Sequence, residues 1–325
     1  MLIPIYILSA AALGPCGDIQ QTERKILAGD VEHTIIQDTL ETLTGLDMRR
    51  VGHFCETALV GSVLTIKRLK NPLDPNSHVY FGTGLGEVQK TMSIFKQTLD
   101  SEGDAVSPYS FINSIGSTTS FYIAKTAGLK SRSITACQDE LSFEWALKLA
   151  CNAIEDKDTN SAMAGGADEF SVPHKEHRRR LLLDDEQIMG EGSGWLYLSG
   201  ERDSAIGEVI EVRYLPFTGA DDAHKWAREV SNVCKPYLAG KPPFLLPGFR
   251  VNAGRLDALT KAIPGVKVRR YLDYCGCFHT AAAFAVASVF DTPHKSDSIY
   301  LHVNSDIEGR TMAVVFKAYG IGGGG

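Results

Sequence analysis

The stretch from residue 128 to residue 169 constrains the fold more than any other part of the chain. Its sequence, GLKSRSITACQDELSFEWALKLACNAIEDKDTNSAMAGGADE, opens with a β-branched run, continues through a helical segment and a short second strand, and closes on a Gly-Gly turn. Cys137 stands where the first strand meets the polar residues before the helix. Backbone N–H groups at a helix N-terminus favour a thiolate, which suits acyl-thioester chemistry. The stretch therefore predicts a strand–helix–strand unit with a candidate nucleophile.

Composition excludes several classes of protein. With 325 residues, of which 44% are hydrophobic and 22% charged, the chain is typical of soluble globular proteins and long enough for two similar halves. A net charge of -6 argues against a general nucleic-acid binder. The seven cysteines are scattered and odd in number, which favours reduced thiols in the cytoplasm over a disulfide framework.

The first residues, MLIPIYILSAAALGPCG, resemble a secretion signal only superficially. They lack a basic start, and Pro4 interrupts the apolar run. We predict a buried strand over 3–9, with a signal or anchor as the alternative. No other apolar run reaches the roughly 20 residues needed to span a bilayer, so no membrane span is expected.

Strand-like and helix-like segments alternate along the chain. The predicted strands are 3–9, 79–82, 133–136, 161–164, 194–198, 207–214, 244–247, 267–271, 298–304 and 312–319. The predicted helices are 49–69, 85–99, 112–126, 142–155, 220–239, 254–263 and 280–289. Such alternation predicts an α/β protein with helices covering central sheets. Charged and turn-forming residues at 200–206 predict a boundary between halves spanning 1–200 and 201–320, followed by a flexible tail at 321–325.

The motifs, taken in order, resemble the β-ketoacyl-ACP synthases of the thiolase superfamily. The matching segments are IYILSAAALGPCGD, HVYFGTGLGE, SPYSFINSIGSTTSFYIAKTAGLKSRSITAC, AGGADE, GEGSGWLYLSGERDSAIGEVIEV, CGCFHTAAAFAVASVF and NSDIEGRTMAVVFKAY. The resemblance implies a thiolase-like layered αβαβα fold with two related ketosynthase-like halves, and a dimer. It places the nucleophile at Cys137 and a catalytic histidine at His279.

Three segments depart from the pattern of that family. Its first catalytic histidine, in a His-Gly-Thr-Gly-Thr motif, has no counterpart in LLPGFRVNAGRLD, around Pro247–Arg250. Tyr274 stands where a lysine is usual, and Asp306–Ile307–Glu308–Gly309 represents the Gly-Phe-Gly-Gly gating loop. The region after Cys137 carries about three extra residues. If they precede the helix, the place of the nucleophile falls near Glu140 and Cys137 matches by coincidence.

Cys137 and His279 are the candidate catalytic residues. Cys137 would be the acylated nucleophile, although Asp139 and Glu140 next to it should raise the pKa of its thiol. The alternative is a small buried side chain at a strand end. His279 would act as a general acid or base, or donate a hydrogen bond to the enolate left by decarboxylation. Its alternative is a structural histidine that ties helix to strand.

We expect no metal and no cofactor. Cys275, Cys277 and His279 form C-x-C-x-H, but a closed zinc site needs four ligands and no second cluster of Cys or His lies at useful spacing. The glycines of FGTGLGE do not make a dinucleotide fingerprint. The alternative for the two cysteines is a pair of buried thiols on a strand that leads to the helix.

The run PHKEHRRRLLL is a candidate docking site for an acyl carrier protein. Carrier proteins are acidic, so Lys175, Arg178, Arg179 and Arg180 could steer one to this surface. The alternative is a solvated loop. The resemblance further implies that side chains around 111–121 and 143–149 reach a dimer interface and an acyl tunnel.

Three functions remain open from the sequence. The first, suggested by the similarity of ELSFEWALKLACNAIE and AGGADE to short chain-length-factor subunits, is a weakly active or inactive subunit. It pairs with a catalytic β-ketoacyl-ACP synthase as a heterodimer in type II polyketide or fatty-acid-like biosynthesis, such as polyene assembly. The second is an autonomous acyltransferase that condenses an acyl group on Cys137 with malonyl-ACP through His279. The third is a carrier-protein-binding scaffold without a tunnel.

Overall fold

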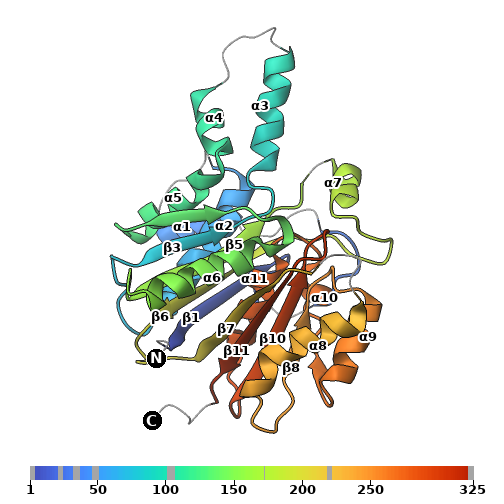
Figure 1. Cartoon of the computed structure of the whole chain (residues 1–325). Coiled ribbons are helices and arrows are strands. Elements are labelled where there is room, and N and C mark those ends of the chain that lie inside the picture. Colours follow the sequence, from blue (N-terminus) through green and yellow to red (C-terminus); the bar gives the residue numbers. More distant parts are fainter. Residues whose placement is uncertain are drawn as a thin grey trace.

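One mixed sheet of 11 strands organises the protein (Figure 1). The computed structural model describes residues 4–20, 25–31, 37–45, 51–100, 107–171, 173–217 and 222–320. The strands are β1 (Ile5–Gly14), β2 (Gly17–Asp18), β3 (His78–Gly82), β4 (Ser133–Ala136), β5 (Ser161–Asp168), β6 (Gly192–Ser199), β7 (Gly207–Leu215), β8 (Phe244–Pro247), β9 (Lys267–Val268), β10 (Ser298–Ser305) and β11 (Thr311–Ala318). Their order is β4-β3-β5-β6-β1-β7-β11-β10-β8-β9, and β2 pairs with β1.

The described part of the chain contains more helices than the seven predicted from the sequence, and the helix predicted over 142–155 has those bounds. They are α1 (Gln37–Thr44), α2 (His53–Lys67), α3 (Val88–Asp100), α4 (Pro108–Ser114), α5 (Gly116–Ala127), α6 (Ser142–Glu155), α7 (His174–Arg180), α8 (Ala223–Cys234), α9 (Ala253–Ala262), α10 (Leu272–Cys275) and α11 (Ala281–Ala287). Single 3₁₀ turns precede α6 (Asp139–Leu141) and follow α8 (Lys235–Tyr237) and α11 (Ser288–Asp291).

The sheet topology repeats on either side of its centre. From β1 outward, β6 and β5 are antiparallel neighbours, and then β3 and β4 continue parallel to β5. From β7 outward, β11 and β10 are antiparallel neighbours, and then β8 and β9 continue parallel to β10. The two sets meet where β1 and β7 pair antiparallel. The loop at 200–206 lies between the two sets, and the division of the chain at this loop stays a prediction.

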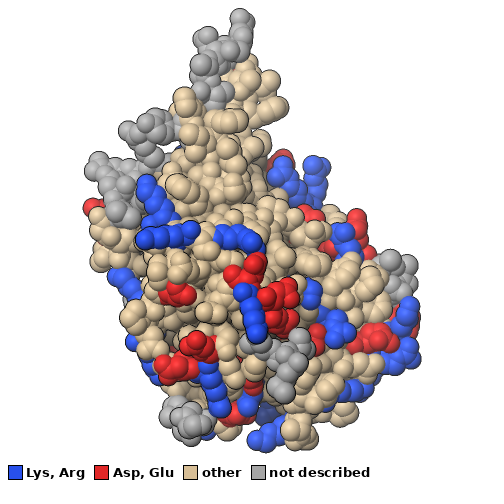
Figure 2. Space-filling view, turned by 60° about the vertical axis from the view of Figure 1, so that its left-hand side comes forward, with Lys and Arg blue, Asp and Glu red and all other residues tan. Residues whose placement is uncertain are grey.

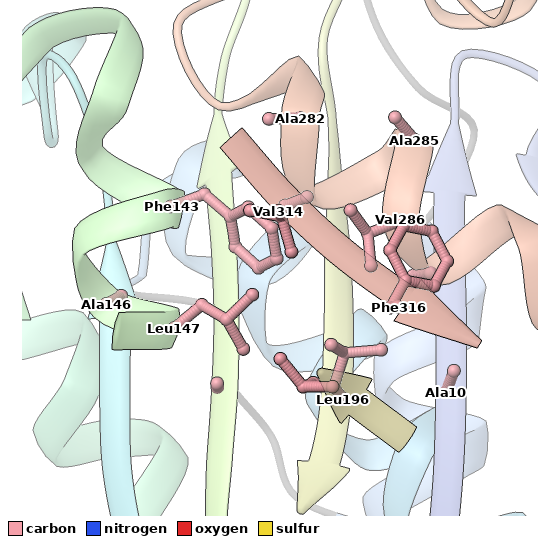
Figure 3. Packing of buried hydrophobic residues seen from close by; sticks show 14 of the residues in the cluster. Ala10, Phe143, Ala146, Leu147, Leu196, Ala282, Ala285, Val286, Val314 and Phe316 are labelled. Carbon is pink, nitrogen blue, oxygen red and sulfur yellow. The ribbon is translucent and has the colours of Figure 1, made fainter. Parts of the chain in front are cut away.

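Helices α6 and α11 fill the space between the two sets of strands. Phe143 and Leu147 of α6 and Val286 of α11 pack with Leu196 of β6 and Phe316 of β11 (Figure 3). All seven residues of α11 are buried, and its alanines let both strand sets approach closely. Helix α2 covers the opposite face of the first set, while α8 and α9 cover that of the second. This is the predicted thiolase-like αβαβα layering, and the fold class is confirmed.

Helices α3 and α4 project from the body of the molecule (Figure 1). None of the side chains of α3 is buried, and Met92, Phe95 and Leu99 are 44%, 61% and 66% exposed. Phe111 and Ile112 of α4 are also exposed. Figure 2 shows this projecting part mostly without charged side chains. An apolar surface of this kind is typical of a contact with another protein.

Some predicted segments end at other residues than expected. The single helix predicted over 112–126 is wrong: the chain leaves helical geometry at Ile115 (φ -77°, ψ 125°), which separates α4 from α5. The helix predicted from 85 begins at Val88 because Gly86 takes a positive φ of 65°. The strand predicted over 267–271 ends at Val268, and α10 follows.

The ends of the chain are only partly covered by the structure. Strand β1 confirms a strand near the N-terminus, while residues 1–3 and the tail predicted at 321–325 lie outside the described residues. The start of the helix predicted from residue 49 also lies outside them. In the described ranges, every helix is too short or too polar to cross a membrane.

Candidate functional site

Segments from both strand sets meet at the C-terminal ends of the parallel strands. The turn after β3, the residues after β4 and β5, the segment after β8, the residues before α11 and the end of β10 all contribute. Open α/β sheets place their sites at such strand ends. The two predicted catalytic residues lie in these segments: Cys137 follows β4, and His279 precedes α11.

Asp168 joins three of these segments. Its Oδ1 accepts hydrogen bonds from the Thr83 hydroxyl (2.7 Å) and from the backbone N–H groups of Gly84 (3.0 Å) and Leu85 (3.2 Å). Its Oδ2 accepts from the backbone N–H (3.0 Å) and hydroxyl (2.8 Å) of Thr280. A buried carboxylate with this many donors is fully satisfied. It fixes the turn after β3 against the start of α11.

This contact also sets the position of His279. A Cβ on Gly84 would lie 2.3 Å from the Cβ of His279, so only glycine lets the two segments come this close. His279 is 6% exposed, and its Nδ1 has no hydrogen-bond partner among the described residues. A buried ring nitrogen without a partner is unusual in a purely structural histidine. The catalytic role of His279 stays a prediction.

Cys137 lies just after β4 and is exposed, so the alternative of a buried thiol is wrong. Partial desolvation of the sulfur raises the pKa of the Cys137 thiol, and the negative charges of Asp168 and Asp139 raise it further. The 3₁₀ turn Asp139–Leu141 separates Cys137 from α6. Helix α6 therefore does not stabilise a thiolate at Cys137, and Glu140 stands closer to its start.

Glu140 forms a largely buried ion pair with Arg250. Its Oε1 accepts from Arg250 Nη2 at 2.7 Å and from Nε at 3.0 Å, and the two side chains are only 4% and 13% exposed. Arg250 comes from the segment after β8, where the first catalytic histidine was expected and not found. The two positions that departed from the pattern in sequence are thus joined by a charge-assisted contact in space.

A second buried pair joins Glu144, in the first turn of α6, to His302 of β10. Glu144 Oε1 is 2.9 Å from His302 Nε2 and accepts from Asn304 Nδ2 at 2.9 Å. His302 Nδ1 lies 2.9 Å from the Leu246 carbonyl, which can only accept, so Nδ1 donates. One proton must therefore lie between Nε2 and the carboxyl group. This network was not predicted from the sequence. The signals were an acidic residue in an apolar helix and a histidine in an apolar strand, and neither indicates the other as its partner.

The basic run forms a helix, not the solvated loop of the alternative. In α7, Lys175, Arg179 and Arg180 are exposed, as a docking surface requires. Arg178 instead contacts Asp30 Oδ1 and Oδ2 at 3.3 Å and donates to the Gln187 carbonyl at 2.8 Å, so it holds neighbouring loops together. Carrier-protein docking by these residues stays a prediction.

His177 of the same helix is buried and brings a second imidazole toward the site. Burial lowers its pKa to about 4, and the nearby charge of His279 contributes to the shift. Neither of its ring nitrogens has a hydrogen-bond partner among the described residues. Its place within a run of charged residues gave no signal that it would turn inward.

The segment at the gating loop's position is a tight polar turn. Asp306 is 3% exposed, and its Oδ1 accepts from the backbone N–H groups of Glu308 (3.0 Å) and Arg310 (2.9 Å). Its Oδ2 also contacts Arg310 Nε. Such bonds hold one conformation, whereas a glycine-rich loop can move.

Cys275 and Cys277 are buried, as their alternative interpretation expected, although Cys275 ends α10 rather than lying on a strand. Burial raises the pKa of the Cys277 thiol to about 12. Within the ranges that the structure covers, no three His, Cys, Asp or Glu side chains lie close enough together to hold a metal ion.

A sizeable cavity lies away from these residues. It has a volume of about 740 Å³ and is lined by the N-terminal ends of several strands, including Val209, Phe244 and Ile299. Neither Cys137 nor His279 lines it. The cavity therefore gives no support to a substrate path to these two residues.

The fold is similar to that of several solved condensing enzymes. The ishigamide ketosynthase/chain length factor matches with a TM-score of 0.77 and 16% identity over 98% of this chain and 100% of that one. A type II PKS acyl-carrier protein in complex with its ketosynthase bound to the hexaketide (AntDE:AntF) gives 0.77 and 14% over the same shares. A β-ketoacyl synthase from Burkholderia phymatum gives 0.75 and 14%, again over 98% and 100%. The sequence matches no protein-family profile and no curated protein.

Proposed function

We propose that the protein is a chain-length-factor-type subunit that pairs with a catalytic β-ketoacyl-ACP synthase in the cytoplasm. The complex would act in type II polyketide or fatty-acid-like biosynthesis, such as polyene assembly, and this subunit would be weakly active or inactive by itself. The observation that carries the proposal is the buried Glu140–Arg250 pair within a ketosynthase-like fold. A carboxylate whose oxygen accepts two guanidinium N–H groups is a poor nucleophile.

The surface of the molecule supports a partner subunit. Strand β4 is the last strand of the sheet on its side, and within the described ranges no strand pairs with its outer edge. The exposed apolar side chains of Phe111, Ile112, Ile115 and Phe121 lie on the neighbouring α4–α5 segment. An open strand edge beside apolar helices is suited to pairing with another chain. We propose that the partner ketosynthase covers this surface.

Carrier-protein docking is the third part of the proposal. Lys175, Arg179 and Arg180 present positive charge on the outside of α7, while His177 and Arg178 anchor the helix beneath them. A rigid basic surface raises the association rate of an acidic partner. The carrier protein bound to a ketosynthase in one similar structure is consistent with this role.

The test is a reconstitution of activity with and without a partner. The purified chain alone, a co-expressed catalytic ketosynthase alone and their complex are assayed for malonyl decarboxylation and for condensation. We expect a stable heterodimer, and condensation only when the catalytic partner is present. Full condensation by the chain alone would overturn the proposal.

One observation favours the second function, an autonomous β-ketoacyl-ACP synthase. His177 and His279 together supply two imidazoles, the number that decarboxylating condensation uses. The acylation site is tested by incubating the chain with an acyl-thioester and mapping the adduct by mass spectrometry. In this case Cys137→Ala abolishes the adduct and His177→Ala abolishes condensation, while an unchanged adduct in Cys137→Ala rejects this function.

A further inference from the structure

Three buried glutamates lie beneath the projecting helices. Glu87 directly precedes α3, Glu169 follows β5 and Glu191 precedes β6, and they are 4%, 4% and 0% exposed. They gather at the N-terminus of α2, where His53 Nε2 lies 2.7 Å from Glu191 Oε1. The other oxygen of Glu191 accepts from the backbone N–H of Phe170 at 2.9 Å. Carboxyl groups from three separate segments thus share one desolvated region.

Two of these groups attach the base of α3 to the body of the protein. Glu169 Oε1 accepts the backbone N–H of Gln89, in the first turn of α3, at 3.3 Å. The carboxyl group of Glu87 lies against the N-terminus of α2, where the backbone N–H of Cys55 favours its ionised form. A Cβ on Gly52 would lie 2.1 Å from Glu87 Oε1, so a larger residue at position 52 would force the Glu87 carboxyl group to shift. Glu87 Oε1 has no hydrogen-bond partner within the described ranges.

The rest of α3 contributes little to its attachment. Since none of its side chains is buried, its position depends on the contacts at its base and on its packing with α4. Segments with few buried apolar contacts open at low cost in free energy. The contacts at the base of α3 and its packing with α4 therefore determine where the helix pair lies.

Burial keeps protons on these two carboxyl groups to a higher pH than is usual for glutamate. Burial raises the pKa of Glu87 to about 7 and that of Glu169 to about 8, and the charge of Glu87 adds to the second shift. The charged groups that face them are His53 and Glu56 from α2, Lys90 from α3, and Glu191. Two carboxylates in one desolvated region repel each other when both ionise.

We infer that proton release from Glu87 and Glu169 loosens the base of α3, so that the apolar surface on α3 and α4 is well ordered only while these carboxyl groups are protonated. The loosening is a property of this chain alone. Its consequence, weaker pairing with the partner ketosynthase in mildly alkaline solution, rests on the proposed function.

Hydrogen–deuterium exchange of the chain alone tests the loosening. After correction for intrinsic rates, protection of α3 amides should fall about tenfold relative to α2 between about pH 6 and about pH 9. The double variant Glu87→Gln, Glu169→Gln keeps the shape and an acceptor oxygen on each side chain but cannot ionise, so its protection should not change with pH. Glu176→Gln, which alters an exposed carboxyl group on α7, should respond as the wild type does.

The amides of α2 in the same samples report whether the double variant folds. If the double variant does not fold, the wild-type protein is titrated instead, with the glutamate carboxyl carbons followed by NMR. The carboxyl groups of Glu87 and Glu169 should then titrate well above the ordinary value. Protection of α3 that is the same at both pH values would overturn the inference. So would a folded double variant that still loses protection, or ordinary titration of both carboxyl groups.

Sedimentation of the chain with a co-expressed ketosynthase separates this inference from the proposed function. The wild-type complex should weaken from about pH 6 to about pH 9, and that of the double variant should not. A wild-type complex of constant strength, with α3 loosened, would overturn the regulatory consequence. Absence of a complex at both pH values would overturn the proposed function and leave the loosening as measured.

Discussion

Two buried carboxylate centres at the same edge of the sheet differ in how well they are satisfied. Both oxygens of Asp168 accept several hydrogen bonds, whereas Glu140 and Glu144 each keep one buried oxygen without a partner among the described residues. A satisfied buried network rigidifies the fold, while a partly satisfied one costs free energy. Asp168 therefore holds several segments of the fold together. The Glu140 and Glu144 centre, with one oxygen on each side chain unpaired within the described ranges, should stabilise the protein less.

The largest effect on the free energy of unfolding is expected at Asp168, whose two oxygens both accept hydrogen bonds. Asp168→Ala removes the acceptor for the Thr83 and Thr280 hydroxyls and for the nearby backbone N–H groups. The free energy of unfolding should fall by about 4 kcal/mol, because several buried donors lose their partner. Urea denaturation measures this change. Asp168→Asn, which keeps the shape and one acceptor oxygen, should cost less, and a loss below about 1 kcal/mol in the alanine variant would contradict the comparison.

A smaller loss in the free energy of unfolding is expected at the Glu140–Arg250 pair, and a second substitution should reverse most of it. Arg250→Ala leaves Glu140 buried without its cation and should cost about 3 kcal/mol. The double variant Glu140→Gln, Arg250→Met removes both charges and should recover most of that loss, as replacement of a buried ion pair commonly does. The same denaturation assay compares the three proteins. Equal losses in the single and double variants would show that the ion pair is not the source of the cost.

A third prediction concerns pH and the carboxyl groups under α3. The native pKa values of about 7 for Glu87 and about 8 for Glu169 lie above the ordinary 4.5, so the folded chain holds protons that the unfolded chain releases. The free energy of unfolding should therefore fall as the pH rises from about 4.5 to about 8, by on the order of several kcal/mol. His53 acts in the same direction: burial opposes its charge, but the bond to Glu191 outweighs burial and raises its pKa.

Denaturation at a series of pH values measures this slope. The double variant Glu87→Gln, Glu169→Gln should flatten it, while Glu176→Gln should leave it unchanged. A stability that rises over this range would contradict the assignment of raised pKa values to the two buried carboxyl groups.

The smallest effect on stability is expected far from both centres, on α7. Lys175→Glu with Arg180→Glu should change the free energy of unfolding by less than about 0.5 kcal/mol, since both side chains are exposed. Affinity for an acidic carrier protein should fall by about fivefold, and the loss should shrink at high salt. Surface plasmon resonance against the carrier protein measures both. An unchanged affinity would remove α7 from the docking proposal.

Much of the fold could be predicted because local patterns determine it. Alternating strand-like and helix-like runs indicated the layers, and the order of the motifs indicated the thiolase-like arrangement, which the structure and its similarity to solved ketosynthases confirm. Helix ends were less predictable. The break at Ile115 lies in a run whose composition suits a helix on both sides, and only its backbone geometry reveals it.

The site was less predictable because its contacts join distant residues. Glu140 and Arg250 are 110 positions apart, and the sequence showed only that each stood near a departure from the family pattern. Nothing in the sequence indicated that a 3₁₀ turn, Asp139–Leu141, would separate Cys137 from the following helix. His177 is buried, although most of the residues around it in the basic run are exposed. No periodic pattern in the sequence predicted this burial.

The short strand β4 has a consequence for producing the protein. Its four residues, Ser133–Ala136, contain no charged side chain and no proline, so the shortness of the strand is its main protection against pairing with another chain. The exposed apolar side chains of the neighbouring α4 and α5 have no such protection, so the chain made without a partner should tend to associate with further copies of itself. If the proposed partner subunit covers this surface, balanced synthesis of the two chains would keep the protein soluble in the cell.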